Sequence, residues 1–186
     1  MLKKAHKCII IYRKFIFSEV LQMKNIIFIN GTMGVGKSTM CRQLNKIVDK
    51  SVWLDGDWCW MADPFTVTAE TKTMVTDNIC HLLNNFISCS EYENIIFCWV
   101  MDYESIYDSI ATNLHTENCN IWRFTLTCSE EELKLRIEND SHQDGRNFEK
   151  SLERMPRFDA MDTVKIFCDN MSPLQTAEKI KALVYR

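Results

Sequence analysis

Glycine and proline are scarce in this chain, which has five glycines and three prolines among its 186 residues. No stretch rich in these residues marks a linker, and the length suits one well-buried domain better than two. Three of the five glycines, Gly31, Gly34 and Gly36, fall within six residues. The tight backbone turns that need glycine are therefore concentrated in one short segment.

Other absences exclude whole classes of protein. The formal net charge of −3 leaves no basic field to hold a nucleic acid polymer. The nine cysteines are odd in number and include no C-x-x-C pair, which argues against a disulfide framework and a zinc site. No apolar run is long enough to span a bilayer. We therefore expect a cytoplasmic protein, monomeric or homodimeric, without nucleic acid or membrane partners.

Residues 1–22 differ from the rest of the chain. Basic residues precede the apolar run CIIIY, but this run is shorter than the core of a secretory signal and is followed by Arg13 and Lys14. Met23 stands directly before the first convincing strand. We interpret residues 1–22 as an N-terminal extension outside the core, or as the product of a mis-assigned start codon, and residues 23–186 as a single domain. A basic membrane anchor is the alternative interpretation.

From residue 23 onward, short apolar runs alternate with stretches of helical character. Strands are predicted at 24–30, 51–54, 94–101, 120–126 and 163–168, and helices at 37–49, 69–89, 103–114, 129–140, 148–158 and 173–185. The strands are almost continuously apolar, as expected for parallel strands that are covered on both faces. Ser129 with Glu132, and Ser172 before Pro173, are typical of helix starts. The alternation predicts an α/β fold, a three-layer α/β/α sandwich with right-handed crossovers.

The glycine-rich segment, GTMGVGKST at 31–39, matches the pattern G-x-x-x-x-G-K-[ST]. A strand precedes it and a helix-compatible stretch follows, which is the context that a phosphate-binding P-loop requires. In such a loop backbone N–H groups bind the phosphates, Lys37 reaches the β- and γ-phosphates, and the Ser38 hydroxyl binds Mg²⁺. The predicted nucleotide-binding residues are Gly31, Thr32, Met33, Gly34, Val35, Gly36, Lys37, Ser38 and Thr39. A glycine-rich turn without a ligand is the alternative.

Two carboxylates, Asp55 and Asp57, follow the second predicted strand in the segment VWLDGDWCW. The carboxyl ends of parallel strands face one crevice, so we expect both side chains near the P-loop. Alternate residues at an extended strand end point the same way. One carboxylate can then hold a metal-bound water while its neighbour meets an incoming hydroxyl. A surface Asp-Gly-Asp turn is the alternative.

On the segments GTMGVGKST and LDGD, the chain resembles the small P-loop kinases of the nucleoside monophosphate kinase-like group. This group includes the shikimate, gluconate and adenylylsulfate kinases and small antibiotic phosphotransferases, and the resemblance covers residues 24–186. It implies a P-loop NTPase fold with a five-stranded parallel sheet of order 2-3-1-4-5, ATP and Mg²⁺ as cofactors, and a mobile lid near 141–147. By the same resemblance, Asp55 assists Mg²⁺ together with Ser38, whereas Asp57 contacts the acceptor hydroxyl.

The resemblance also places arginines near the nucleotide. Residues 133–146, LKLRIENDSHQDGR, read as a helix that breaks into a polar loop. Arg146 is assigned there as the catalytic cation, because negative charge spreads over the equatorial oxygens in the transition state. Arg136 is assigned to the adenine face, where a planar guanidinium stacks well. Arg154 and Arg157 are alternative lid cations, and solvated arginines on a charged helix and loop are the alternative to both roles.

Other positions leave more than one interpretation open. Asp102 is either a second metal-directed group, as in a Walker B strand, or the cap of the helix that follows. Residues 168–173 occupy the place where related kinases wrap backbone around adenine. The aromatic side chains around the Asp-Gly-Asp segment either stack on a ring of the substrate or pack beneath the loop.

These observations predict an ATP-dependent phosphotransferase that acts on a hydroxyl or phosphate of a small molecule. The acceptor is nucleoside- or nucleotide-like, an antibiotic or a sugar acid, and residues 58–92 carry no signature that distinguishes these. A P-loop ATPase or nucleotide-binding regulatory switch is the alternative. GTP specificity is not expected, because the nearest match to a base-reading N-K-x-D motif, NKIVD at 45–49, has the wrong spacing.

Overall fold

A five-stranded parallel sheet forms the centre of the protein, whose computed structural model describes residues 23–139 and 147–186. The strands are β1 Lys24–Asn30, β2 Ser51–Asp55, β3 Asn94–Cys98, β4 Cys119–Thr127 and β5 Val164–Phe167. The helices are α2 Lys37–Ile47, the short 3-10 helix η1 Gly56–Trp60, α3 Ala69–Ser88, α4 Glu104–Ala111, α5 Glu130–Glu138, α6 Phe148–Asp159 and α7 Pro173–Val184. The sheet order is β2-β3-β1-β4-β5 with every neighbouring pair parallel, which confirms the predicted order.

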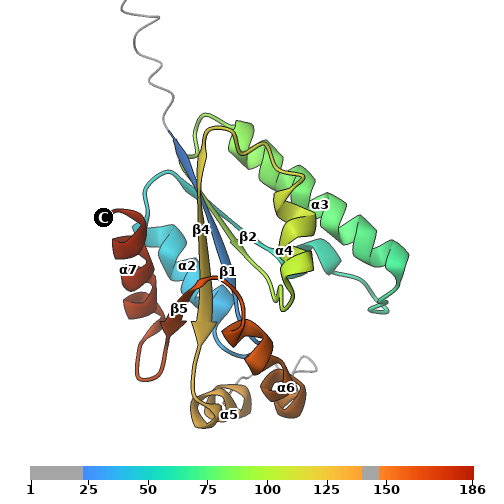
Figure 1. Cartoon of the computed structure of the whole chain (residues 1–186), viewed down its shortest axis with the longest axis vertical. Helices are drawn as coiled ribbons and strands as arrows, with labels where there is room; N and C mark the ends of the chain where they lie inside the picture. The colour runs from blue at the N-terminus through green and yellow to red at the C-terminus, as the bar shows by residue number, and fades with distance from the viewer. Residues whose placement is uncertain (1–22, 140–146) are drawn as a thin grey trace, which may run out of the picture.

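The central strand β1 contributes to two separate core clusters. Ile27 and Ile29 pack with residues of α2 and α7, whereas Ile26 and Phe28 pack with residues of α3 and α4. Successive side chains of a strand point to opposite faces, so a continuously apolar strand needs cover on both sides. Figure 1 shows α2 and α7 on one side of the sheet and α3 and α4 on the other. The three-layer architecture therefore follows from the apolar character of the strands.

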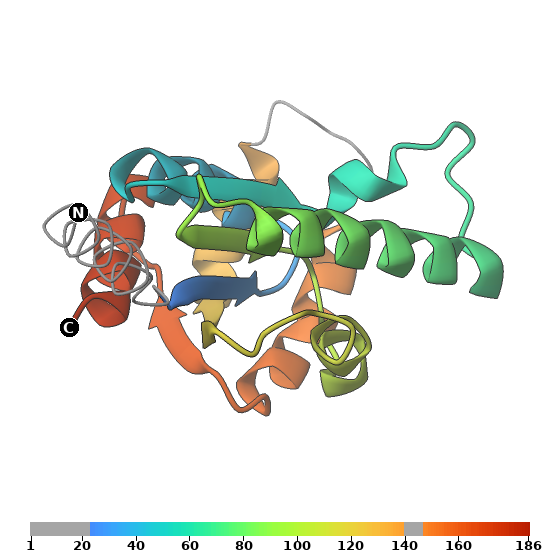
Figure 2. The ribbon, with the colours of Figure 1, turned by 90° about the horizontal axis from the view of Figure 1, so that it is seen from above.

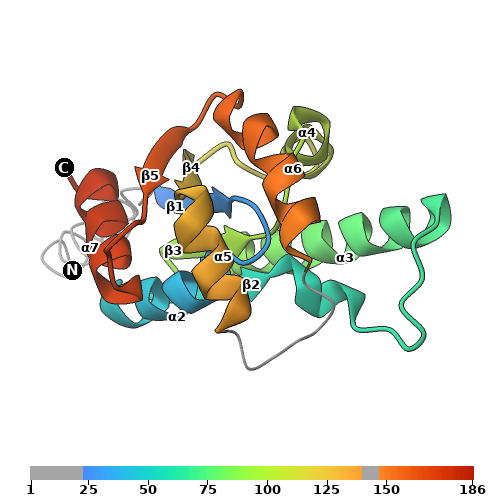
Figure 3. The same ribbon diagram turned by 90° about the horizontal axis from the view of Figure 1, so that it is seen from below.

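The carboxyl ends of the strands form the edge that carries the functional residues. Helices α5 and α6 lie beyond this edge, as Figure 3 shows from below. The segment between η1 and α3 extends away from the sheet together with the first turns of α3 (Figure 2). Residues 61–70 of this region are all exposed. Residues 58–70, which are exposed except for the partly buried Cys59 and Trp60, thus form an arm beside this edge.

Strand β3 is shorter than the sequence predicts. The predicted strand 94–101 ends at Cys98 in the structure. Met101 has a φ of 41°, a left-handed conformation that no strand residue adopts, so the chain has already turned. The predicted helix 103–114 is likewise confined to α4, Glu104–Ala111.

The predicted helix starts are confirmed. Ser172 and Gln175 form a reciprocal capping box, with Pro173 as the first helical residue of α7. The capping box expected for Ser129 and Glu132 forms only in part: the Ser129 hydroxyl accepts from the backbone N–H of Glu132, but the backbone N–H of Ser129 donates to Asp169. These side chains bind N–H groups that have no partner within the helix.

The predicted extension at 1–22 lies outside the described residues and stays a prediction. Within 23–139 and 147–186, none of the helices combines the length and the apolar character that crossing a membrane requires.

Candidate active site

Glycine residues allow the P-loop to turn between β1 and α2. Gly34 and Gly36 have φ values of 85° and 101°, in the left-handed region that side chains with a Cβ rarely adopt. Close packing adds a second requirement at Gly34, where a Cβ would lie 2.6 Å from Ile137 of α5. Gly36 directly precedes the first residue of α2, so the N-terminus of this helix opens onto the loop. This is the backbone arrangement that binds phosphate.

The Lys37 side chain folds back over this loop. Its ammonium group donates to the carbonyl oxygens of Gly31 at 2.9 Å and Thr32 at 3.0 Å. Burial lowers the pKa of Lys37 from its usual 10.5, and nearby acidic groups oppose that shift. A partly desolvated cation at the mouth of a helix N-terminus interacts strongly with any anion that enters the loop.

The Ser38 hydroxyl donates to Oδ2 of Asp55 at 2.6 Å. Asp55 is 5% exposed, and it also accepts hydrogen bonds from the Cys98 thiol at 3.4 Å and from the backbone N–H of Asp57 at 3.2 Å. A hydroxyl and a carboxylate in contact are the oxygen donors that Mg²⁺ prefers. Among the described residues, no three acidic, histidine or cysteine side chains are grouped to hold a metal alone. The pair fits Mg²⁺, which usually keeps waters and phosphate oxygens as its other ligands.

Asp57 lies in η1, and its environment differs from that of Asp55. Its side chain is exposed, and Oδ1 accepts a hydrogen bond of 3.0 Å from the indole Nε1–H of Trp99. The two carboxylates are therefore not equivalent. Asp55 is buried against the P-loop serine, whereas Asp57 reaches the open side of the site.

A cavity of about 890 Å³ connects these groups. The predicted residues that line it are Met33, Gly34, Val35, Gly36, Lys37, Ser38, Thr39, Asp55, Asp57 and Arg136. Cys168, Met171 and Pro173, from the segment predicted to surround adenine, line it as well. Gly31 and Thr32 are not part of its wall, and the Thr32 hydroxyl instead donates to the carbonyl of Ser151 at 2.6 Å. The cavity has a volume typical of a ligand site.

Arg136 of α5 joins two segments of the cavity wall. Its guanidinium donates to the carbonyl of Val35 at 2.6 Å, to the carbonyl of Cys168 at 2.9 Å and to the Glu132 carboxylate at 2.7 Å. Three of its N–H groups are thus engaged, and the orientation of the guanidinium plane is fixed. Arg136 is therefore not a solvated arginine on a charged helix, which was the alternative interpretation.

Asp102 binds arginines of α6. The cap residue of α4 is Tyr103, so the interpretation of Asp102 as that cap is wrong. The Asp102 carboxylate, which is 8% exposed, accepts a hydrogen bond of 2.7 Å from Nη1 of Arg157, and Nε of Arg154 lies 3.8 Å away. The Arg157 guanidinium also lies over the Tyr103 ring, 4.9 Å from its centroid. Both alternative lid cations therefore pair with the loop after β3.

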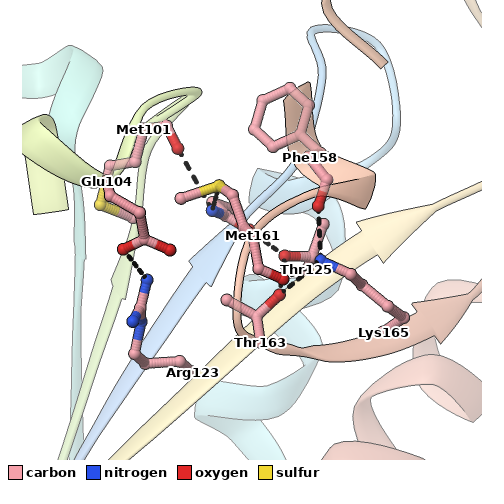
Figure 4. Close-up of polar contacts among 9 residues, drawn as sticks. Met101, Glu104, Arg123, Thr125, Phe158, Met161, Thr163 and Lys165 are labelled. Atoms are coloured by element: carbon pink, nitrogen blue, oxygen red, sulfur yellow. Dashed lines mark hydrogen bonds and ion pairs between the residues drawn. The ribbon is translucent and has the colours of Figure 1, made fainter. Parts of the chain in front are cut away.

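A polar network beneath the edge fixes this loop and the end of α6 (Figure 4). The Asn30 amide, at the end of β1, donates to the carbonyl of Met101 at 3.2 Å, and it accepts from the Thr125 hydroxyl at 2.6 Å. The Lys165 ammonium of β5 donates to the carbonyls of Phe158 and Met161. The loop after β3 and the C-terminal end of α6 are thus tied to the sheet.

Some predicted features lie elsewhere. Arg146 and the predicted lid, apart from Asn147, are outside the described residues, so the role of Arg146 stays a prediction. The NKIVD segment lies at and just beyond the end of α2, where Asn45 accepts a hydrogen bond from the Ser51 hydroxyl at 3.0 Å. Its residues are not among those that line the cavity.

The sequence interpretation missed Trp99. A signal was present, because Trp99 follows the apolar run of β3 and the carboxyl ends of parallel strands face the ligand crevice. The predicted strand 94–101 includes Trp99, but β3 ends at Cys98, one residue before it. For Glu132 the sequence pattern indicates only a role at the start of a helix. In the structure its carboxylate also accepts a hydrogen bond from Arg136.

Comparisons with known proteins agree with this geometry. A family model described as an AAA domain matches residues 27–156, and no curated protein matches the chain. The tunicamycin resistance protein of Deinococcus radiodurans is similar in structure, with a TM-score of 0.64, 17% identity, and coverage of 87% of this chain and 95% of that one.

Two further solved structures are kinases by name. A gluconokinase from Sinorhizobium meliloti has a TM-score of 0.57 and 16% identity, covering 88% of this chain and 97% of that one. A shikimate kinase from Acinetobacter baumannii, in complex with shikimate, has a TM-score of 0.56 and 16% identity, covering 88% and 93%. At such identities the likeness establishes the fold, and the family match covers most of the chain. The chain therefore belongs to the AAA domain family and has the fold of the small P-loop kinases.

Proposed function

We propose that the protein is an ATP-dependent phosphotransferase that moves the γ-phosphoryl group to a hydroxyl or phosphate group of a small molecule. The observation that carries the proposal is one cavity lined by the P-loop, by Asp55 and by Asp57. The P-loop and Asp55 account for a nucleotide with its metal ion. The second, exposed carboxylate beside them supplies what an acceptor hydroxyl needs, a group that accepts its proton and aligns its oxygen.

The nucleotide end of the site is assigned to the P-loop and Arg136. The loop N–H groups and Lys37 bind the phosphates, for which glycine conformations and the start of α2 provide the geometry. The Arg136 guanidinium, held by the carbonyls of Val35 and Cys168, offers a planar face to the adenine ring.

Ser38 and Asp55 are assigned to Mg²⁺, which when bound neutralises phosphate charge during transfer. Asp57 orients the acceptor oxygen and accepts its proton. Arg146 remains our proposal for the cation that stabilises the transferring group, by resemblance to the small P-loop kinases. The eight cysteines in the described ranges are free thiols, which supports the proposed cytoplasmic location.

The acceptor is proposed to carry a ring or another broad apolar face. The arm next to Asp57 exposes large apolar side chains, with Trp58 53% exposed, Met61 83% and Phe65 64%. Exposed large apolar side chains are typical of interaction sites, and this segment follows Asp57 directly in the chain. One of the similar solved structures, the shikimate kinase, is named for a compound of this kind, because shikimate contains a ring.

A coupled assay of ADP release tests the proposal. ATP and Mg²⁺ are supplied with tunicamycin, shikimate, adenosine, uridine or the linear acid gluconate, and each rate is compared with hydrolysis by water alone. We expect a ring-bearing hydroxyl compound to raise ADP release at least about tenfold, and Asp57→Asn to abolish the increase, since general-base groups contribute about 10²- to 10⁴-fold. Basal hydrolysis that no small hydroxyl compound raises would favour the ATPase or switch.

A further inference from the structure

The indole of Trp99 and the carboxylate of Asp57 connect two strand ends. Trp99 is the first residue after β3, and its Nε1–H donates to Oδ1 of Asp57 at 3.0 Å. The backbone N–H of Trp99 donates to the carbonyl of Ile29 at 3.2 Å, so its main chain is anchored to β1. The donor is therefore attached to the sheet, whereas Asp57 lies on the short helix η1.

Gly56 adapts the Asp-Gly-Asp segment to this indole. A Cβ at Gly56 would lie 2.5 Å from Cγ of Trp99, a distance that real Cβ atoms do not show. Gly56 is not among the glycines with positive φ, so the backbone conformation does not require glycine here. Glycine is required at this position because the Trp99 ring approaches so closely. The residue between Asp55 and Asp57 in the sequence is therefore glycine because a larger side chain would collide with the Trp99 ring.

The chemistry of the pair is directional. An indole N–H can donate a hydrogen bond and cannot accept one, so the carboxylate oxygen of Asp57 is the acceptor in this contact. The Trp99 ring also packs against Trp60, with 6.5 Å between ring centroids, so its orientation is supported from a second side. A fixed donor on one carboxylate oxygen restricts rotation of the whole carboxylate group.

We propose that Trp99 is a positioning residue, which holds the Asp57 carboxylate in the orientation that receives the proton of the acceptor hydroxyl. The inference rests on the proposed function, because it needs Asp57 to act on an acceptor. The indole hydrogen bond of Trp99 is made to Asp57, and not to Lys37, Ser38 or Asp55. Its removal should therefore affect phosphoryl transfer and leave ATP binding unchanged.

A double-mutant cycle of Trp99 and Asp57 tests this role. ATP is the phosphoryl donor and water is the acceptor. Single-turnover hydrolysis of radiolabelled ATP is measured for the parent, Trp99→Phe, Asp57→Ala and the double variant. We expect Trp99→Phe to lower the single-turnover rate about tenfold, the usual loss for one hydrogen bond to a charged group. The Kd for ATP, measured separately by titration, should be unchanged. In the Asp57→Ala background the same change should alter the rate less than about twofold, because coupled residues are not additive.

Trp122→Phe is the matched control. Trp122, which pairs with Ile27 in the middle of β1, also donates an indole hydrogen bond to a side-chain oxygen. Its acceptor is Oδ1 of Asn25 at 3.1 Å, near the amino end of β1 and away from the strand ends that carry Asp57 and Trp99. Its removal should leave the rate unchanged. Gly56→Ala should reproduce the Trp99→Phe defect, because the added Cβ displaces the ring while Asp57 is retained.

An NMR measurement reads the contact without activity. The indole ¹H–¹⁵N signal that disappears in Trp99→Phe identifies Trp99, and we expect it to shift in Asp57→Ala while the Trp122 signal does not move. A parent-like rate for Trp99→Phe beside a strong loss for Asp57→Ala would overturn the positioning role and leave the proposed function standing. Equal losses from Trp99→Phe in both backgrounds would show a purely structural residue. Parent-like rates for Asp57→Ala as well would overturn the positioning role, because Asp57 would then have no effect for Trp99 to act through. The proposed function is tested separately, by the acceptor-dependent release of ADP.

Discussion

The Ser38 hydroxyl at the start of α2 lies 2.6 Å from Oδ2 of Asp55 at the end of β2. Strands β1 and β2 are not neighbours in the sheet, because β3 lies between them. The hydrogen bond therefore crosses the end of β3, where the Cys98 thiol contacts the same carboxylate oxygen at 3.4 Å. The P-loop and the Asp-Gly-Asp segment are thus joined into one site through oxygen atoms that suit Mg²⁺.

Lys37→Ala should abolish phosphoryl transfer and leave the fold intact. We propose that the ammonium balances phosphate charge, and in the structure it donates to backbone carbonyls of the P-loop residues Gly31 and Thr32. Loss of such an electrostatic group costs about 10²-fold or more in rate. Rates within about threefold of the parent, at a melting temperature within about 5 °C, would contradict the assignment.

Asp55→Asn and Asp57→Asn should respond differently to magnesium. If Asp55 binds Mg²⁺ as proposed, Asp55→Asn should need more Mg²⁺ for its half-maximal rate, and extra metal should partly restore the rate. Asp57→Asn should keep ATP binding and lose about 10²- to 10⁴-fold in transfer, with no rescue. The measurement is a Mg²⁺ titration of both variants, and the same rescue in both would remove the division of roles.

Asp102→Asn should lower the free energy of unfolding by about 1–2 kcal/mol, because Arg157 and Arg154 lose their shared carboxylate. The arginines are about a third exposed, which limits the loss. Urea unfolding measures it, with the exposed Asp108→Asn on α4 as the matched control. An increased Mg²⁺ requirement without loss of stability would instead support the metal-directed interpretation of Asp102.

Removal of residues 1–22 should change the melting temperature by less than about 5 °C. The first strand begins at Lys24, whose ammonium donates to the carbonyls of Ile87 and Cys89 and remains in the truncated chain. Removal of residues 1–28 is the contrasting control, because it deletes the buried side chains of Ile26, Ile27 and Phe28. A large loss from the shorter truncation would assign residues 1–22 to the core.

The stability of the protein should fall in alkaline solution, partly through Cys128. Burial raises the pKa of this thiol from 9.0 to about 11, and Arg136 opposes the shift. Between these values the unfolded chain binds fewer protons than the folded one, so the free energy of unfolding decreases as pH rises. Below pH 9 the contribution is fully present. Urea unfolding at several pH values should show a smaller decrease for Cys128→Ala than for the parent.

The local features of the site were predictable from the sequence. The P-loop is nine consecutive residues, and the conformations of Gly34 and Gly36 follow from their own place in the chain. The alternation of apolar strands with helices predicted the three layers, because each element carries its own periodicity. The strand order came from the resemblance to kinases rather than from any residue pattern.

The contacts that complete the site were decided by tertiary structure. Arg136 reaches Val35 and Cys168 across 101 and 32 residues, and its role in the wall depends on where α5 lies against the loop. Trp99 bonds to Asp57 across 42 residues, and Gly56 is required because the two strand ends converge there. Chain-local patterns fix which elements form and which ends carry polar groups. Which side chains meet depends on strand order, twist and the point at which each strand stops, and these are properties of the assembled sheet.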